Sequence, residues 1–198
     1  DYDNDGDLDL FIGATIGASK FFQNNGNGTF QDITSLTGIN INDQVRGCSW
    51  FDYNQDGYLD LYIGLLYEPN LLYKNNGDGT FIDIAQNAGA TGPIGAGIIM
   101  GLGAIDYNRD GYQDLYITQD NYNGNILLKN EGGSFFTDVS YSSQTDLEVM
   151  GMGIAFGDIN KDGLFDFYTT NLNENSLLLN STNAVSYTHL RAHETLLD

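Results

Sequence analysis

The clearest pattern along the chain is a short segment in which apolar and small or polar positions alternate. Residues 60–65 have the sequence Asp-Leu-Tyr-Ile-Gly-Leu, and residues 114–118 have the sequence Asp-Leu-Tyr-Ile-Thr. Both segments are rich in β-branched and aromatic residues and lack the apolar spacing of a helix. Each therefore predicts a β-strand.

Three further strand-like segments surround this one in a fixed order. The segment before it carries small residues at alternate positions, as in 101–105, which suits a strand packed close to the central channel of a propeller. The two segments after it are 70–75 and 81–84 in the second repeat, joined by an Asn-Gly-Asp-Gly turn. Such turns tolerate positive φ and are strong hairpin signals. Each repeat therefore predicts four antiparallel strands.

The whole unit recurs, with repeats aligned from residues 1, 52, 106 and 158. A period near 50 residues with four strands per unit is typical of a β-propeller blade. We therefore predict an all-β fold, a β-propeller fragment with two complete four-stranded blades and two partial ones. The first blade lacks its inner strand and the fourth its outer strand. The predicted propeller spans 1–183, with blades at 1–45 (partial), 46–98, 99–150 and 151–183 (partial).

The repeat pattern stops after Asn180, where another glycine-rich hairpin is expected. Residues 185–195 instead resemble a translated sequencing-adapter read-through. We therefore predict that residues 184–198 are a non-native or disordered tail. Because Asp1 already lies inside a repeat, we also interpret the chain as a fragment of a longer protein.

An acidic loop joins the first and second strands of each repeat. It carries side-chain oxygens at positions 1, 3, 5 and 9 and glycine at position 6. Calcium takes six to eight oxygen ligands, and glycine permits the sharp turn that brings position 9 back to the ion. Position 7 varies, as expected where only its carbonyl binds. The sequence thus predicts up to four Ca²⁺ ions. The predicted ligands are Asp1, Asp3, Asp5, Asp7, Asp9, Asp52, Asn54, Asp56, Tyr58, Asp60, Asp106, Asn108, Asp110, Tyr112, Asp114, Asp158, Asn160, Asp162, Leu164 and Asp166.

An EF-hand is the main alternative for such a loop, and the sequence argues against it. An EF-hand requires a bidentate glutamate at position 12 and a helix on each side. Position 12 is isoleucine or threonine here, and each loop leads into a predicted strand. The loop therefore connects strands.

The charge balance agrees with these loops. The formal net charge is −20, and fourteen of the 27 acidic residues are aspartates of the four loops. Four divalent ions would reduce the net charge to −12. With only 7 basic residues and no basic patch, nucleic acid is an unsuitable partner. No apolar run is long enough to cross a bilayer, so we expect no membrane insertion.

Together, these motifs resemble the FG-GAP/VCBS repeat family, and the combination with Asn-Asn-Gly-Asp-Gly-Thr-Phe resembles its ASPIC/UnbV-associated group. The resemblance covers about residues 1–180. It implies a calcium-binding propeller related to the integrin α-subunit head, usually with seven blades. It also implies an extracellular or periplasmic location, often at the cell surface.

Several functions remain open at this level. The ions are expected to be structural, with a regulatory or ligand-bridging ion as the alternative. Six tyrosines are candidates for sugar stacking or, more simply, for packing between blades. Asp32 and Asp83 recur with the blade period, which favours a hydrogen-bonding role at strand ends. The six tyrosines are Tyr58, Tyr62, Tyr67, Tyr112, Tyr116 and Tyr122.

We predict a non-catalytic, calcium-binding propeller module that presents a surface to a protein or glycan outside the cytoplasm. The alternative is the propeller part of a calcium-dependent carbohydrate-active enzyme such as a polysaccharide lyase. That function requires a catalytic residue present in a single blade, and Arg46 and Arg109 are the candidates.

Overall fold

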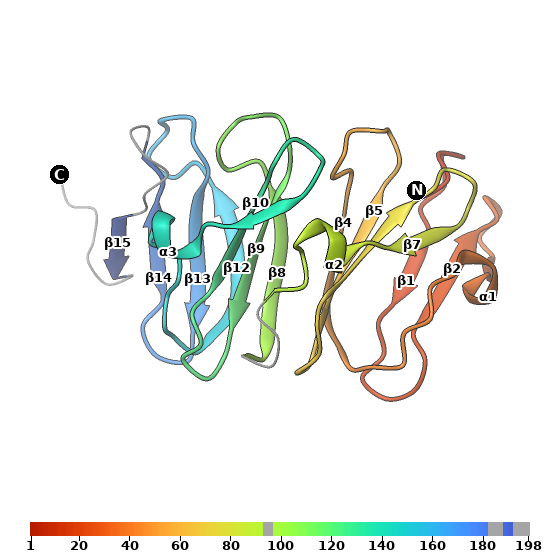
Figure 1. Cartoon of the computed structure of the whole chain (residues 1–198), viewed down its shortest axis with the longest axis horizontal. Helices are drawn as coiled ribbons and strands as arrows, with labels where there is room; N and C mark the ends of the chain where they lie inside the picture. The colour runs from red at the N-terminus through yellow and green to blue at the C-terminus, as the bar shows by residue number, and fades with distance from the viewer. Residues whose placement is uncertain (93–96, 182–187, 192–198) are drawn as a thin grey trace.

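The computed structural model describes residues 1–92 and 97–181 and the backbone of 188–191. Four antiparallel sheets stand side by side in chain order, from red at the N-terminus to blue at the C-terminus (Figure 1). In each sheet the strands follow one another in sequence, which is the arrangement of propeller blades. The predicted all-β propeller fold is confirmed.

The sheets are here called blades 1 to 4. Blade 1 has three strands, β1 (Leu10–Ile12), β2 (Lys20–Asn24) and β3 (Phe30–Asp32). Blade 2 contains β4 (Val45–Phe51), β5 (Asp60–Leu65), β6 (Leu71–Asn75) and β7 (Phe81–Asp83). Blade 3 contains β8 (Ile99–Ile105), β9 (Asp114–Gln119), β10 (Ile126–Asn130) and β11 (Phe136–Asp138). Blade 4 contains β12 (Gly151–Gly157), β13 (Asp166–Asn171), β14 (Ser176–Leu179) and β15 (Thr188–Arg191).

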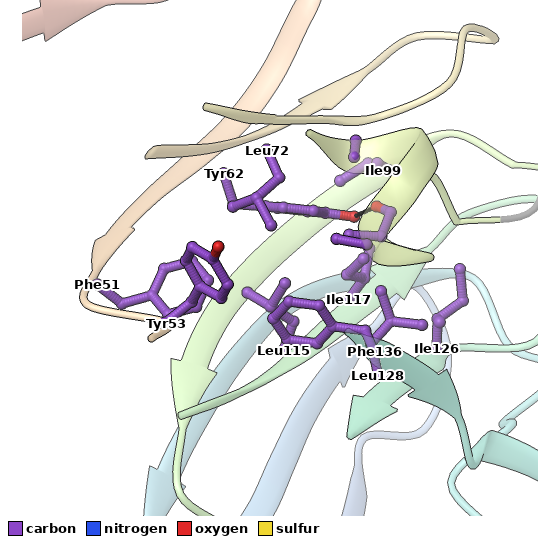
Figure 2. Packing of buried hydrophobic residues seen from close by; sticks show 13 residues of the cluster. Phe51, Tyr53, Tyr62, Leu72, Ile99, Leu115, Ile117, Ile126, Leu128 and Phe136 are labelled. Atoms are coloured by element: carbon purple, nitrogen blue, oxygen red, sulfur yellow. Dashed lines mark hydrogen bonds between the residues drawn. The ribbon is translucent and has the colours of Figure 1, made fainter. Parts of the chain in front are cut away.

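Alternation along the second strand of a blade sends its side chains to two different cores. In β5, Leu61 and Ile63 pack against blade 1, whereas Tyr62 packs with Leu115 and Ile117 of blade 3 (Figure 2). A blade between two others is thus covered on both faces, which explains why every residue of β5 and β9 is buried. The interfaces between blades therefore form the hydrophobic core.

The first strands of neighbouring blades approach each other closely. A Cβ atom at Gly101 of β8 would lie 3.1 Å from Cα of Gly153 in β12. One at Gly103 would lie 2.5 Å from Cε2 of Phe156. The small residues predicted to line the crowded inner strand are therefore confirmed in that role.

A one-turn helix follows the outer strand of blades 1 to 3, and the sequence analysis did not predict it. The helices are α1 (Thr34–Thr37), α2 (Ala85–Ala88) and α3 (Ser140–Ser143). Oδ1 of Asp32, Asp83 and Asp138 accepts a hydrogen bond from the backbone N–H two residues further on. The strand-end role predicted for Asp32 and Asp83 is confirmed.

Blade 4 differs from the prediction in one respect. Residues 188–191 of the predicted tail form β15, which pairs with β14 and gives this sheet a fourth strand. Without β15, the outer edge of β14 would expose unpaired backbone donors and acceptors, and such an edge pairs with an extended segment largely regardless of its sequence. The rest of the predicted tail, residues 184–187 and 192–198, lies outside the described residues, as do residues 182 and 183.

Blade 1 has only three strands, as predicted, and one face without a neighbouring blade among the described residues. Leu10 and Ile12 are 44% and 46% exposed, whereas the equivalent Leu61 and Ile63 of blade 2 are fully buried. The same residue types therefore lie at a core face in one blade and at an open face in the other.

A recurring asparagine ties each blade to the preceding one. Nδ2 of Asn75 donates to the carbonyl of Tyr2 at 2.8 Å, and Nδ2 of Asn130 donates to the carbonyl of Tyr53 at 2.8 Å. Asn180 makes the equivalent bond in blade 4. Because these amides are buried, each bond joins two blades in a place that water does not reach.

Replacing Asn130 by alanine should destabilise the chain by about 2–3 kcal/mol, because buried partners then lose their hydrogen bonds. Asn24→Ala is the matched control: Asn24 bonds only within blade 1, to the Leu8 carbonyl among others, and lies half-buried. Denaturant unfolding of both variants measures the difference. Equal losses would mean that the bond between blades contributes nothing.

Candidate metal centre

In blades 2 to 4 the acidic loop lies between the first two strands, and in blade 1 it precedes β1; each loop is folded by its own side chains. In the second loop, Oδ1 and Oδ2 of Asp52 accept hydrogen bonds from the N–H groups of Asp56 and Gly57, at 3.1 and 2.8 Å. Gly57 has φ of +89°, which an L side chain rarely adopts. The other loops repeat the glycine bond and its positive φ. The aspartate at position 1 therefore sets the turn that glycine allows.

The first loop gathers three carboxylates. One oxygen from each of Asp1, Asp3 and Asp9 lies within 4.8 Å of the others. Calcium ligands at 2.3–2.6 Å from the ion lie no more than about 5 Å apart, so this spacing suits a single ion. Oδ1 of Asp1 is buried without a hydrogen-bond partner, which leaves it available as a ligand. The donor set and its spacing fit a hard cation.

The aspartate at position 9 is the buried anchor of each loop. Asp60 and Asp114 are fully buried at the start of β5 and β9. Oδ1 of Asp114 accepts from the N–H of Asn130 at 2.7 Å, and Oδ2 accepts from that of Tyr107 at 3.2 Å. Asp9, Asp60 and Asp166 hold the equivalent pair of amides. The sequence pattern predicts position 9 as a metal ligand only, and gives no sign of this structural role.

In the second and third loops, burial opposes the negative charge of the position-9 carboxylate. Burial raises the pKa of Asp60 to about 7, and the charges of Asp56 and Asp52 add to this rise, although two backbone N–H groups act against it. Burial likewise raises the pKa of Asp114 to about 7, with Asp110 and Asp106 contributing. A bound cation would offset this repulsion.

Positions 3, 5 and 7 are arranged less uniformly than the sequence suggested. The cluster of the first loop contains Asp3 but neither Asp5 nor Asp7. In the second loop, Nδ2 of Asn54 donates to Oδ2 of Asp56 at 2.9 Å, and Lys74 lies 3.7 Å from that oxygen. The carboxylate at position 5 is thus held by neighbours in this loop. Its assignment as a ligand stays a prediction.

In the second and third loops, the tyrosine ring at position 7 packs outside the predicted coordination sphere. A Cβ atom at Gly77 would lie 2.8 Å from Cε2 of Tyr58, and one at Gly133 would lie 3.3 Å from Cε1 of Tyr112. Both tyrosine rings therefore rest on the hairpin turn of their own blade. In these two loops, position 7 therefore has only its backbone carbonyl to offer an ion, as predicted from the sequence.

The profile of the FG-GAP-like repeat family matches residues 1–63, 65–117 and 106–169. The chain belongs to this family. The matched segments contain all four acidic loops, which agrees with the resemblance found in the sequence.

Two relatives share part of their sequence with this FG-GAP-like chain. Cartilage acidic protein 1 of Xenopus tropicalis is 28% identical over 170 residues, which cover 80% of this chain and 26% of that protein. Cartilage acidic protein 1 of Homo sapiens is 34% identical over 94 residues, 48% of this chain and 14% of that protein. The chain therefore spans about a quarter or less of the length of these relatives.

One solved structure supports the same fold. A lectin of Agrocybe aegerita, described as recognising non-reducing terminal N-acetylglucosamine, superposes with a TM-score of 0.55 at 18% identity. The superposition covers 95% of this chain and 49% of the lectin chain. At this identity the likeness shows the fold of the FG-GAP-like chain.

Proposed function

We propose that this FG-GAP-like chain is a calcium-binding, non-catalytic propeller module that presents a binding surface outside the cytoplasm. The observation that carries the proposal is the cluster of Asp1, Asp3 and Asp9, with an unpaired buried oxygen on Asp1. Carboxylates at this spacing repel one another unless a cation lies between them. The first loop has the most carboxylates, so it should bind calcium most tightly.

The proposed location follows from calcium availability. Loops of this kind are filled where calcium is about 10⁻⁴–10⁻³ M, as it is around extracellular modules. The net charge of −20 also disfavours anionic partners unless cations bridge them. In the described part of the chain, helices are too short and too polar to cross a membrane.

The candidate ligand surface lies at the turns between the second and third strands of blades 2 and 3. Tyr67 and Tyr122 project there with 57% of each side chain exposed, and both have positive φ. Tyr62 and Tyr116, by contrast, are fully buried between blades. Exposed tyrosine rings stack on sugars and also anchor protein partners, so a glycan or a protein is the proposed ligand.

Arg109, one of the two arginines considered as catalytic residues, makes a contact that a structural role explains. Arg109 donates a hydrogen bond to the carbonyl of Gly163 in the next loop. This contact has uncharged counterparts in the other blades, Asn4 with Gly57 and Gln55 with Gly111. The repetition favours a non-catalytic role for Arg109.

The test of the surface is a glycan array probed with the full chain in calcium and in chelator. We expect binding to a restricted set of glycans in calcium, reduced at least about tenfold in Tyr67→Ala and Tyr122→Ala. Tyr141→Ala is the control, because Tyr141 is 87% exposed and belongs to α3 and not to these turns. Binding that survives both substitutions would reject the surface, and the absence of any glycan signal would leave a protein ligand.

A further inference from the structure

Neighbouring acidic loops contact each other through the same two positions. Nδ2 of Asn4 donates to the carbonyl of Gly57 at 3.0 Å, and Nε2 of Gln55 donates to the carbonyl of Gly111 at 2.7 Å. Arg109 donates to the carbonyl of Gly163. In every case the side chain at position 4 reaches position 6 of the next loop. The contact thus runs in one direction along the row of blades.

The backbone conformation at position 4 is the same in all four loops. Asn4, Gln55, Arg109 and Lys161 have φ between 59° and 61°, a region that residues other than glycine seldom occupy. Such a conformation costs about 1–2 kcal/mol for an L residue. Its recurrence in four loops shows that the loop geometry imposes it. In each of the three loops that are followed by another loop, the position-4 side chain donates a hydrogen bond to that next loop.

The accepting carbonyl belongs to a peptide group that also holds predicted ligands. On the other side of that peptide, the N–H of Tyr112 donates to Oδ1 of Asp110 at 2.9 Å. The N–H of Gly111 itself donates to Oδ2 of Asp106 at 3.0 Å. The carbonyl of Tyr112, a predicted ligand, follows in the chain. Gln55 therefore orients a peptide unit that is bonded on its other side to a loop carboxylate.

We propose that the position-4 side chain of each loop is a positioning residue for the cation site of the next loop. The candidate sites are then linked in series: the occupancy of one loop depends on a side chain of the preceding one. This inference rests on the proposed calcium binding. It predicts that removing the Gln55 donor weakens the site at 106–114 and leaves its own loop, 52–60, unchanged.

The identity of the donor should also set the relative affinity of the sites. The loop at 106–114 receives a neutral amide from Gln55, whereas the loop at 158–166 receives the guanidinium of Arg109. A fixed positive charge beside a cation site opposes binding. We therefore expect calcium to bind more weakly at 158–166 than at 106–114.

The test uses hydrogen-exchange mass spectrometry of the full chain across a calcium titration. Peptides covering 52–60, 106–114 and 158–166 report each loop separately. Gln55→Met keeps the length of the side chain and removes the donor. Gln55→Asn restores a shorter donor, which serves in the first loop as Asn4. Lys161→Met is the matched control, because Lys161 has the same φ and no next loop to contact within the described residues.

For Gln55→Met we expect the calcium concentration at the midpoint for 106–114 to rise about threefold or more. This is the effect expected from the loss of one hydrogen bond. The midpoint at 52–60 should stay within about twofold, and Gln55→Asn should recover much of the loss. Lys161→Met should change neither site. Equal midpoints at 106–114 in wild type and Gln55→Met would overturn the proposal.

A measurement in chelator separates this inference from the calcium proposal. Without calcium, exchange at 106–114 should still be faster in Gln55→Met than in wild type, since the contact exists without an ion. If no loop of the wild type responds to calcium, the proposed calcium binding is wrong. The exchange rates of wild type and Gln55→Met in chelator then test whether Gln55 positions the loop at 106–114. Unchanged exchange in chelator would then overturn the positioning role of Gln55.

Discussion

Transfer from millimolar calcium into chelator is expected to lower the thermal unfolding midpoint of the full chain by about 10 °C or more. A site at 10 times its dissociation constant stabilises the folded state by about 1.4 kcal/mol. About 1 kcal/mol shifts the midpoint of a domain of this size by about 2–4 °C, so four occupied loops suffice. Differential scanning fluorimetry with calcium, magnesium and chelator measures the effect. An unchanged midpoint in a cooperatively folded sample would reject the calcium assignment.

Protons should partly replace calcium when the ion is removed. The pKa of Asp60 and of Asp114 is about 7 in the folded chain, against an ordinary value of 3.8. The folded state therefore binds protons more tightly, and stability in chelator should rise as the pH falls from 8 towards 5. The stabilisation by calcium should shrink over the same range, because protons compete for these carboxylates. A midpoint in chelator that falls on acidification would contradict this account.

The second large effect is expected for Asp114→Ala, which should destabilise the chain by about 3 kcal/mol or more. The substitution leaves the buried N–H groups of Tyr107 and Asn130 without an acceptor, and each unpaired group costs about 1–3 kcal/mol. It also removes a predicted ligand. The loss should therefore appear in chelator as well as in calcium.

Asp110→Ala is the matched comparison in the same loop. Asp110 is solvent-exposed, and its bonds are confined to the loop itself, including those from the N–H of Tyr112 and Nδ2 of Asn108. This substitution should lower calcium affinity and the midpoint in calcium, with a loss below about 1 kcal/mol in chelator. Chemical unfolding of both variants in both conditions distinguishes the roles. Equal losses in chelator would mean that position 9 is no more structural than position 5.

Local sequence patterns were sufficient to predict the strands and hairpins of the blades. Alternation in 60–65 and 114–118 predicts strands because side chains of a strand point to opposite faces at every second residue. The Asn-Gly and Asp-Gly turns fix the hairpins through positive φ, as at Gly77 and Gly79. Repetition of these local signals also predicted the number of sheets and the place of each acidic loop.

Contacts between residues far apart in the chain escaped the sequence analysis. Asn75 and Asn130 recur with the blade period, but their partners Tyr2 and Tyr53 lie more than 70 residues away. Gln55 is likewise 56 residues from its acceptor Gly111. A recurring polar residue at a strand end was the available signal. Its partner could not be predicted, because the acceptor is a backbone carbonyl, which every residue carries.

The sequence by itself determined the strands, the hairpins and the acidic loops of this protein, because each depends on residues close together in the chain. The tertiary structure decided which of the equivalent residues are buried and which carboxylates come together. Leu10 is exposed and Leu61 is buried because only one of them faces another blade. Asp9 joins Asp1 and Asp3 while Asp5 stays outside the cluster, because the fold of the loop sets where each carboxylate points.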